Sequence, residues 1–160
     1  MLSTTKAIVS YRDGGNSSHG TVCVLTVSSS SISAGTPVVY NAADGYASII
    51  ALNSTKAIVT YSNSGNGNRG TAQILTISGT TISAGAKHVF YGGPCATESY
   101  LNAISETEVL LDFPSNTQIR MYITLNISGT TVTSGDPTVY TDNAQHSSMT
   151  IMSATKRIVA

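Results

Sequence analysis

The chain has 160 residues, about the length of one domain, and a hydrophobic content of 41% that is sufficient to bury a core. Eight basic and eight acidic residues give no net charge, so no overall field attracts nucleic acid or an anionic membrane. Charged residues make up only 10% of the chain, whereas soluble domains contain roughly 25%.

Ser, Thr, Gly and Asn replace the missing charges, a composition common in secreted, adhesive or virion-exposed β-proteins. No apolar run approaches the length of a membrane-spanning helix, and no signal-peptide pattern precedes the first repeat. We therefore expect an extracellular or virion-associated protein that does not insert into membranes and that is released by a route such as cell lysis.

One seven-residue stretch recurs along the chain at intervals of 50, 52 and 48 residues, the last copy being partial. The copies lie at residues 5–11, 55–61, 107–113 and 155–159. A fixed period of this size is the signature of a repeat architecture. We divide the single domain, residues 1–160, into repeats at about 2–51, 52–103 and 104–152, with a partial fourth at 153–160.

Each repeat is predicted to contain four strands. The recurring stretch places Ala7, Val9 and Tyr11 on one face and polar residues on the other, as half-buried strands do. A turn rich in Gly and Asn leads to a second strand at residues 21–27, and a tight turn leads to a third at 32–40. A glycine recurs inside the third strand and predicts a bulge or kink there. These glycines are Gly35, Gly85 and Gly135.

The longest connection of each repeat follows the third strand. These connections are residues 41–46, 91–98 and 141–146. A short strand of small residues then closes the repeat. Its copies are residues 47–51, 99–103 and 147–151. Because the other three connections are hairpin-like, we group this strand with the next opening strand and the two strands after it into one antiparallel sheet. No segment has helical periodicity, so the chain is predicted to be all-β.

A period near 50 residues with four antiparallel strands predicts a β-propeller-like array of three repeats. Propellers have about 4 to 8 blades, so three repeats are too few for a ring. The chain enters its first repeat one strand late and ends with a surplus opening strand at 153–160, which competes with residues 3–10 for one place. We therefore expect closure by oligomerisation, with a homodimer forming a six-bladed ring. A β-trefoil or β-prism-like three-fold monomer is the alternative.

Three motifs recur in the repeats: Ser-Thr-Lys-Ala-Ile-Val-x-Tyr, Gly-Asn-x-x-x-Gly-Thr, and Leu-Thr-x-Ser-Gly-Thr-Thr-Ile-Ser-x-Gly. Together they resemble a four-stranded repeat of about 50 residues in uncharacterised bacterial and bacteriophage proteins, some of them tail-fibre-like or adhesin-like. The resemblance covers nearly all of residues 2–160 and is weakest at 113–117, where the glycine-rich turn is replaced. It implies a propeller-like repeat with a binding or structural role, without catalytic residues.

Titratable side chains form no catalytic or metal-binding pattern. His19, His88 and His146 fall at unrelated positions of the repeat and lack the close spacing of metal ligands. Cys23 and Cys95 form neither a disulfide framework nor a metal pattern. We therefore expect no enzymatic activity, no metal and no cofactor.

The acidic residues are also expected to be structural. Glu108 and Asp112 share one face of a strand, which we interpret as a solvated face rather than a catalytic carboxylate pair. Asp13 lies in a turn with a faint likeness to a calcium loop, but the second copy of that turn offers no carboxylate.

The aromatic residues divide into two repeated columns and four single tyrosines. The columns, expected in the core between blades, are Tyr11, Tyr61 and Phe113, and Tyr40, Phe90 and Tyr140. The single tyrosines are Tyr46, Tyr91, Tyr100 and Tyr122. Tyrosine rings on loops can stack on sugar faces while the hydroxyl binds ligand or water. The predicted ligand-binding residues are Asn41, Asp44, Tyr46, Tyr91, Tyr100, Asp142 and Asn143.

These features together predict a non-enzymatic, lectin-like adhesion module. It would recognise carbohydrate or a cell-surface receptor through several weak loop sites that act jointly. The rival hypothesis is a structural subunit of a virion, fibre or extracellular assembly, whose loops contact other subunits.

Overall fold

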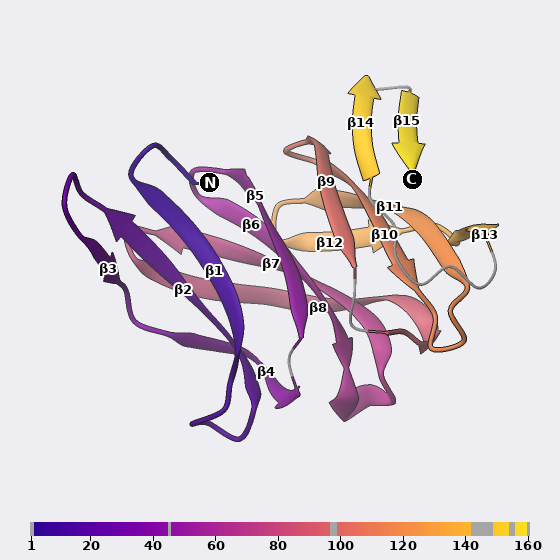
Figure 1. The fold of residues 1–160 in the computed structure, drawn as a ribbon, viewed down its shortest axis with the longest axis horizontal. Helices are drawn as coiled ribbons and strands as arrows, with labels where there is room; N and C mark the ends of the chain where they lie inside the picture. Colours follow the sequence, from indigo (N-terminus) through magenta and orange to yellow (C-terminus); the bar gives the residue numbers. More distant parts are fainter. Residues whose placement is uncertain (1, 45, 97–98, 142–148, 154–155, 160) are drawn as a thin grey trace.

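The computed structural model describes residues 2–44, 46–96, 99–141, 149–153 and 156–159, which form an all-β, antiparallel protein as predicted (Figure 1). Within these residues the helical structure is confined to a short 3-10 turn, η1 (Ser64–Asn66). No helix in the described part of the chain is long and apolar enough to cross a membrane.

The strands form three large sheets and one hairpin in chain order. The first sheet contains β1 (Lys6–Asp13), β2 (His19–Val27), β3 (Ile32–Ala34) and β4 (Val38–Asp44). The second sheet contains β5 (Ala47–Asn53), β6 (Lys56–Asn63), β7 (Arg69–Ser78) and β8 (Thr81–Pro94). The third sheet contains β9 (Tyr100–Ser105), β10 (Glu108–Pro114), β11 (Arg120–Ser128), β12 (Thr131–Ser134) and β13 (Thr138–Thr141). The C-terminal hairpin contains β14 (Met149–Ser153) and β15 (Lys156–Val159).

The second sheet has the order β5-β6-β7-β8, which is the grouping predicted from the connection lengths. The third strand of the repeat is continuous there, as β8, with a register shift near Gly85. In the other two sheets the prediction of a single, continuous third strand was wrong. The third strand is divided there into β3 and β4, which both pair with β2, and into β12 and β13, which both pair with β11. Pro37 and Pro137 explain the breaks, because proline cannot donate to the ladder, whereas the second repeat has Lys87 at this position.

The predicted long connections are largely strand. β4 continues to Asp44 and β8 continues to Pro94, so the loops that were expected from residues 41 and 91 start later. The added residues of β4 and β8 pair with the beginnings of β2 and β7. These two strands start two residues earlier than predicted, at His19 and Arg69. Residues 142–146 of the third such connection lie outside the described residues.

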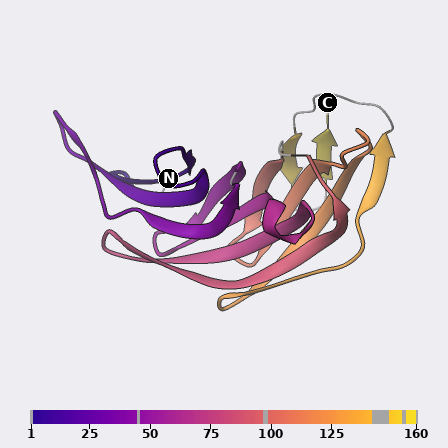
Figure 2. The ribbon, with the colours of Figure 1, turned by 90° about the horizontal axis from the view of Figure 1, so that it is seen from below.

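The sheets stack face to face in chain order and form a curved row (Figure 2). We call the side of a sheet that faces the preceding sheet its front face, and the side that faces the following sheet its back face. One hydrophobic core lies between the first and second sheets, and another between the second and third. β9 lies beside β5, and β14 lies beside β9.

The repeated aromatic columns meet inside these cores, as predicted for all but the outermost members. The rings of Tyr40 and Tyr61 lie 5.2 Å apart between the first two sheets, and those of Phe90 and Phe113 lie 5.0 Å apart between the second and third. All four are at most 5% exposed. Edge-to-face and tilted pairs at this distance add to the stabilisation from burial. Tyr11, on the front face of the first sheet, is only half-buried.

A second contact fixes the spacing of neighbouring sheets. A Cβ atom placed on Gly35 would lie 2.9 Å from Cβ of Thr80, which comes from the β7–β8 turn of the following sheet. Likewise, a Cβ atom on Gly85 would lie 2.8 Å from the carbonyl oxygen of Thr130 in the β11–β12 turn. In both contacts, the turn between the second and third strands of one sheet packs against a glycine on the back face of the preceding sheet. A side chain at that glycine would not fit.

Candidate functional site

Two of the predicted ligand-binding residues are packed inside the fold. Asn41 is 2% exposed, and its Oδ1 accepts a hydrogen bond of 3.2 Å from Nζ of Lys87, which joins β4 to β8. Tyr91 lies in β8 rather than in a loop, and its ring packs 5.4 Å from that of Phe113 at the margin of the core. Both side chains therefore link neighbouring sheets.

The other predicted residues end, follow or begin strands, or lie outside the described part of the chain. Asp44 ends β4, and Tyr46 follows it in the connection to β5. Tyr100 is the first residue of β9. Asp142 and Asn143 lie outside the described residues. The structure therefore leaves Tyr46 and Tyr100 as the predicted tyrosines that expose a large part of the ring, with exposed fractions of 52% and 37%.

An arginine lies over each of these two rings. Cζ of Arg12 is 5.4 Å from the centroid of Tyr46, and Cζ of Arg120 is 5.7 Å from that of Tyr100. At such distances the guanidinium is attracted to the negative face of the ring. Tyr46 immediately precedes β5 and Tyr100 is the first residue of β9. Because β5 and β9 lie side by side and Ser48 contacts Ser99, the two rings lie at the same end of these strands.

The residues below Tyr100 form a buried ionic cluster that the sequence analysis did not identify. Asp112 and Arg120 are both 0% exposed, and Nη2 and Nε of Arg120 donate to the two carboxylate oxygens over 3.1 and 3.4 Å. The hydroxyl of Tyr140 donates to Oδ1 of Asp112 over 3.0 Å. The prediction of a solvated strand face was therefore wrong for Asp112, because neighbouring structure covers this part of β10.

A comparison of the repeats shows which residues the members of the cluster replace. Asp112 occupies the position of Thr60, and Arg120 occupies the position of Gly70. In the second repeat the ring of Phe90 lies directly on Gly70, with only 2.5 Å to a hypothetical Cβ atom. Arg120 fills that space in the third repeat, and Tyr140 binds the carboxylate instead. The joint replacement of the two repeated residues is the sequence signal that could have revealed the pair.

The arginine remains charged and retains one unused donor. Burial lowers the pKa of Arg120, but the hydrogen bond and charge of Asp112, with a smaller contribution from Tyr140, raise it above its ordinary value. Nη1 of Arg120 is buried and has no hydrogen-bond partner among the described residues. A buried N–H of this kind is rare and destabilises a protein unless something accepts from it.

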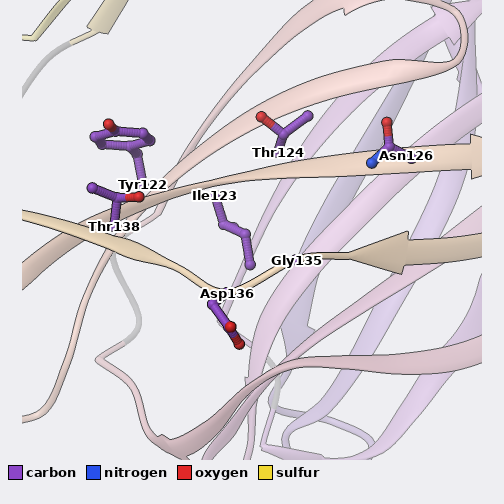
Figure 3. A pocket seen from close by; sticks show the side chains of 7 residues that line it. All are labelled: Tyr122, Ile123, Thr124, Asn126, Gly135, Asp136 and Thr138. Carbon is purple, nitrogen blue, oxygen red and sulfur yellow. The ribbon is translucent and has the colours of Figure 1, made fainter.

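A shallow hollow of about 180 Å³ lies on the back face of the third sheet, beside this cluster (Figure 3). Its lining comes from β11 and from the segment that joins β12 to β13. The lining residues are Tyr122, Ile123, Thr124, Asn126, Gly135, Asp136 and Thr138. Hydroxyl, amide and carboxylate groups predominate, so the hollow differs from the apolar back faces of the first two sheets.

The two cysteines are free, buried thiols. Burial raises the pKa of Cys23 and of Cys95, and for Cys95 the bond with Ser62 offsets part of this rise. Each unit of increase in the pKa lowers the thiolate fraction about tenfold at neutral pH.

We expect a disulfide reagent such as DTNB to titrate two thiols immediately in denaturant and only slowly in buffer. A fast native reaction would show that one of these strands opens readily.

The part of the chain that the structure describes contains no group of three His, Cys, Asp or Glu side chains able to hold a metal ion. No family model, no curated protein and no solved structure matches the chain. The arrangement of its own residues is therefore the basis for the function proposed below.

Proposed function

We propose that the protein is a non-enzymatic recognition module that binds carbohydrate at the edge of the array where Tyr46 and Tyr100 lie. The observation that carries this proposal is the support beneath Tyr100. Its exposed ring rests on an arginine that a buried carboxylate holds in place. A ring that is fixed before binding offers a stacking surface for a sugar at little further entropic cost.

A second exposed tyrosine that lies against an arginine gives a further argument for a glycan ligand. The other Tyr–Arg pair, Tyr46 with Arg12, presents a similar surface at the margin of the first sheet. Two weak sites on one edge would act jointly on a polyvalent cell-surface glycan.

We further propose that the sheets are blades of a propeller-like array. Three observations support this arrangement over a trefoil or prism: the β5-β6-β7-β8 order, the face-to-face stacking of sheets in chain order, and the innermost strands β5, β9 and β14 lying side by side. The tyrosines then lie on the side of the array where the outermost strand of one blade connects to the innermost strand of the next. Together with the resemblance to tail-fibre-like repeats, this suggests a protein of a virion or bacterial surface.

A glycan array followed by titration calorimetry with a monovalent hit tests the proposal. Replacing Tyr100 by Ala should raise the Kd at least about tenfold, since removal of an aromatic anchor costs more than ~1.4 kcal/mol. Val89→Ala is the control, because Val89 is comparably exposed, at 39%, and lies on β8, outside both tyrosine–arginine pairs. We expect this control to bind as the natural protein does.

Two outcomes would contradict the carbohydrate site. Binding that survives Tyr100→Ala would show that the ligand is held elsewhere. An array without hits would favour a structural subunit of a larger assembly.

A further inference from the structure

The contact between the first and second sheets and the contact between the second and third sheets have the same arrangement. The front face of a sheet is apolar and packs against the back face of the sheet before it. In the second sheet, Ile77 and Ile82 on the front face are 4% and 5% exposed, and in the third sheet their counterparts, Ile127 and Val132, are 6% and 3% exposed. Covering such side chains is the main favourable contribution to each contact.

The front face of the first sheet keeps these apolar residues but is not covered. Val27 and Ile32 occupy the positions of Ile77 and Ile82, yet they are 39% and 68% exposed. Ala7, Val9 and Tyr11 continue this face along β1 and are only half-buried. The first sheet thus displays an apolar surface of the same kind that the other two sheets bury.

The back face of the third sheet is uncovered in the complementary way. Gly135 occupies the position of Gly35 and Gly85, but no atom lies within 4 Å of its hypothetical Cβ atom. The hollow of about 180 Å³ lies at this glycine, where the other two sheets hold the threonine of a following turn (Figure 3). Thr124 replaces the buried Val24 and Ile74, so this face is more polar than its counterparts.

We propose that a second copy of this chain docks the front face of its first sheet onto the back face of the third sheet. Ser30 of the β2–β3 turn, which occupies the position of Thr80 and Thr130, would be seated at Gly135. Val27 and Ile32 would be covered as their counterparts are. The polar lining suits this role, because a face that is exposed before assembly must remain soluble.

The C-terminal hairpin occupies part of the place that the docking sheet needs. β14 pairs with β15 in the register of β5 with β6, since Met149 is opposite Val159 as Ile49 is opposite Val59. β15 also repeats the Thr-Lys-x-Ile-Val sequence that begins β1. We infer that β1 of the second copy takes the place of β15 beside β14, so β15 competes with assembly. If each copy docks on the other, two identical contacts close a ring of six sheets.

Light scattering of the purified full chain tests the docking. We expect a mass of twice 16.5 kDa. Ile32→Glu introduces a charge into the front face of the first sheet, and Gly135→Gln fills the hollow at a glycine that has room for a side chain. Each variant should have the mass of a monomer by light scattering and the secondary structure of the natural protein by circular dichroism. Val89→Glu, at an exposed position of the second sheet and away from both faces, should remain a dimer.

A mixture of the two interface variants gives a sharper test. Ile32→Glu has an intact third sheet and Gly135→Gln has an intact first sheet, so one natural contact can form between them. The mixture should therefore contain mixed dimers that neither variant forms alone. Ile158→Pro, which places a proline in β15 opposite Thr150, should lower the dimer dissociation constant several-fold.

A natural chain that is monomeric at all concentrations would overturn the proposal, as would dimers that survive both interface substitutions. Failure to form mixed dimers would exclude head-to-tail docking. An Ile158→Pro chain that dissociates more readily would exclude the exchange of β1 for β15. The readouts of these tests are the mass of the assembly and the mixing of the variants, so they do not depend on whether a sugar binds at Tyr100.

Discussion

Replacement of Asp112 by threonine, the residue at its position in the second repeat, is expected to lower the free energy of unfolding by about 3–5 kcal/mol. Breaking a buried ion pair by removing one partner has this effect because the remaining charge is left without compensation. Arg120 is 0% exposed, and Asp112 accepts both of its described hydrogen bonds. Equilibrium unfolding in urea, followed by circular dichroism, measures the loss.

The chain supplies its own control for this effect. The double variant Asp112→Thr with Arg120→Gly copies Thr60 and Gly70 and leaves no charge in the site. It should be more stable than Asp112→Thr alone, because no uncompensated buried charge remains, and the space vacated by the Arg120 side chain keeps the recovery incomplete. Losses that simply add, with the double variant less stable than either single variant, would show that the two residues do not act as a pair.

Gly70→Ala is expected to lower the free energy of unfolding by about 1–3 kcal/mol through overpacking. The added methyl group would lie 2.5 Å from the ring of Phe90, which is buried between the second and third sheets and cannot move aside freely. Thermal or urea unfolding of the purified variant provides the measurement.

Gly92→Ala is the matched control, because it lies in the same strand as Phe90 and has no atom within 4 Å of the added carbon. Its effect should remain within about 0.5 kcal/mol, as for most surface substitutions. Similar losses from both variants would indicate that backbone freedom, and not the contact with Phe90, limits Gly70.

The repeat, the strands and their grouping into sheets could be predicted because they depend on local signals. Alternation along residues 5–11 and the Gly-rich turns are properties of a short stretch; the alternating stretch is present in all three repeats and the Gly-rich turn in the first two. The breaks at Pro37 and Pro137 could also have been predicted, since a proline interrupts a ladder wherever it lies. The lengths of β4 and β8 could not, because they depend on where β2 and β7 begin.

The ionic cluster was missed for a related reason. A carboxylate on a polar strand face is exposed unless another element covers it, and the alternation along β10 contains no information about that neighbour. Only a comparison of Asp112 and Arg120 with Thr60 and Gly70, taken together, points to a pair. Likewise, Tyr46, Tyr91 and Tyr100 look alike as unrepeated tyrosines, yet the packing buries part of Tyr91 and leaves the other two accessible.

The sequence by itself determined that this protein is an all-β chain of three repeats with apolar front faces, because strand alternation and repeat period are written residue by residue. The tertiary structure alone decided which of those faces are covered. Ile32 and Ile82 belong to the same pattern, but one is 68% exposed and the other 5% exposed, because the second sheet has another sheet in front of it and the first sheet does not. Burial is a property of neighbouring sheets, and so is the uncovered glycine at Gly135. The ionic cluster under Tyr100 depends instead on which side chains of β10, β11 and β13 meet within one sheet.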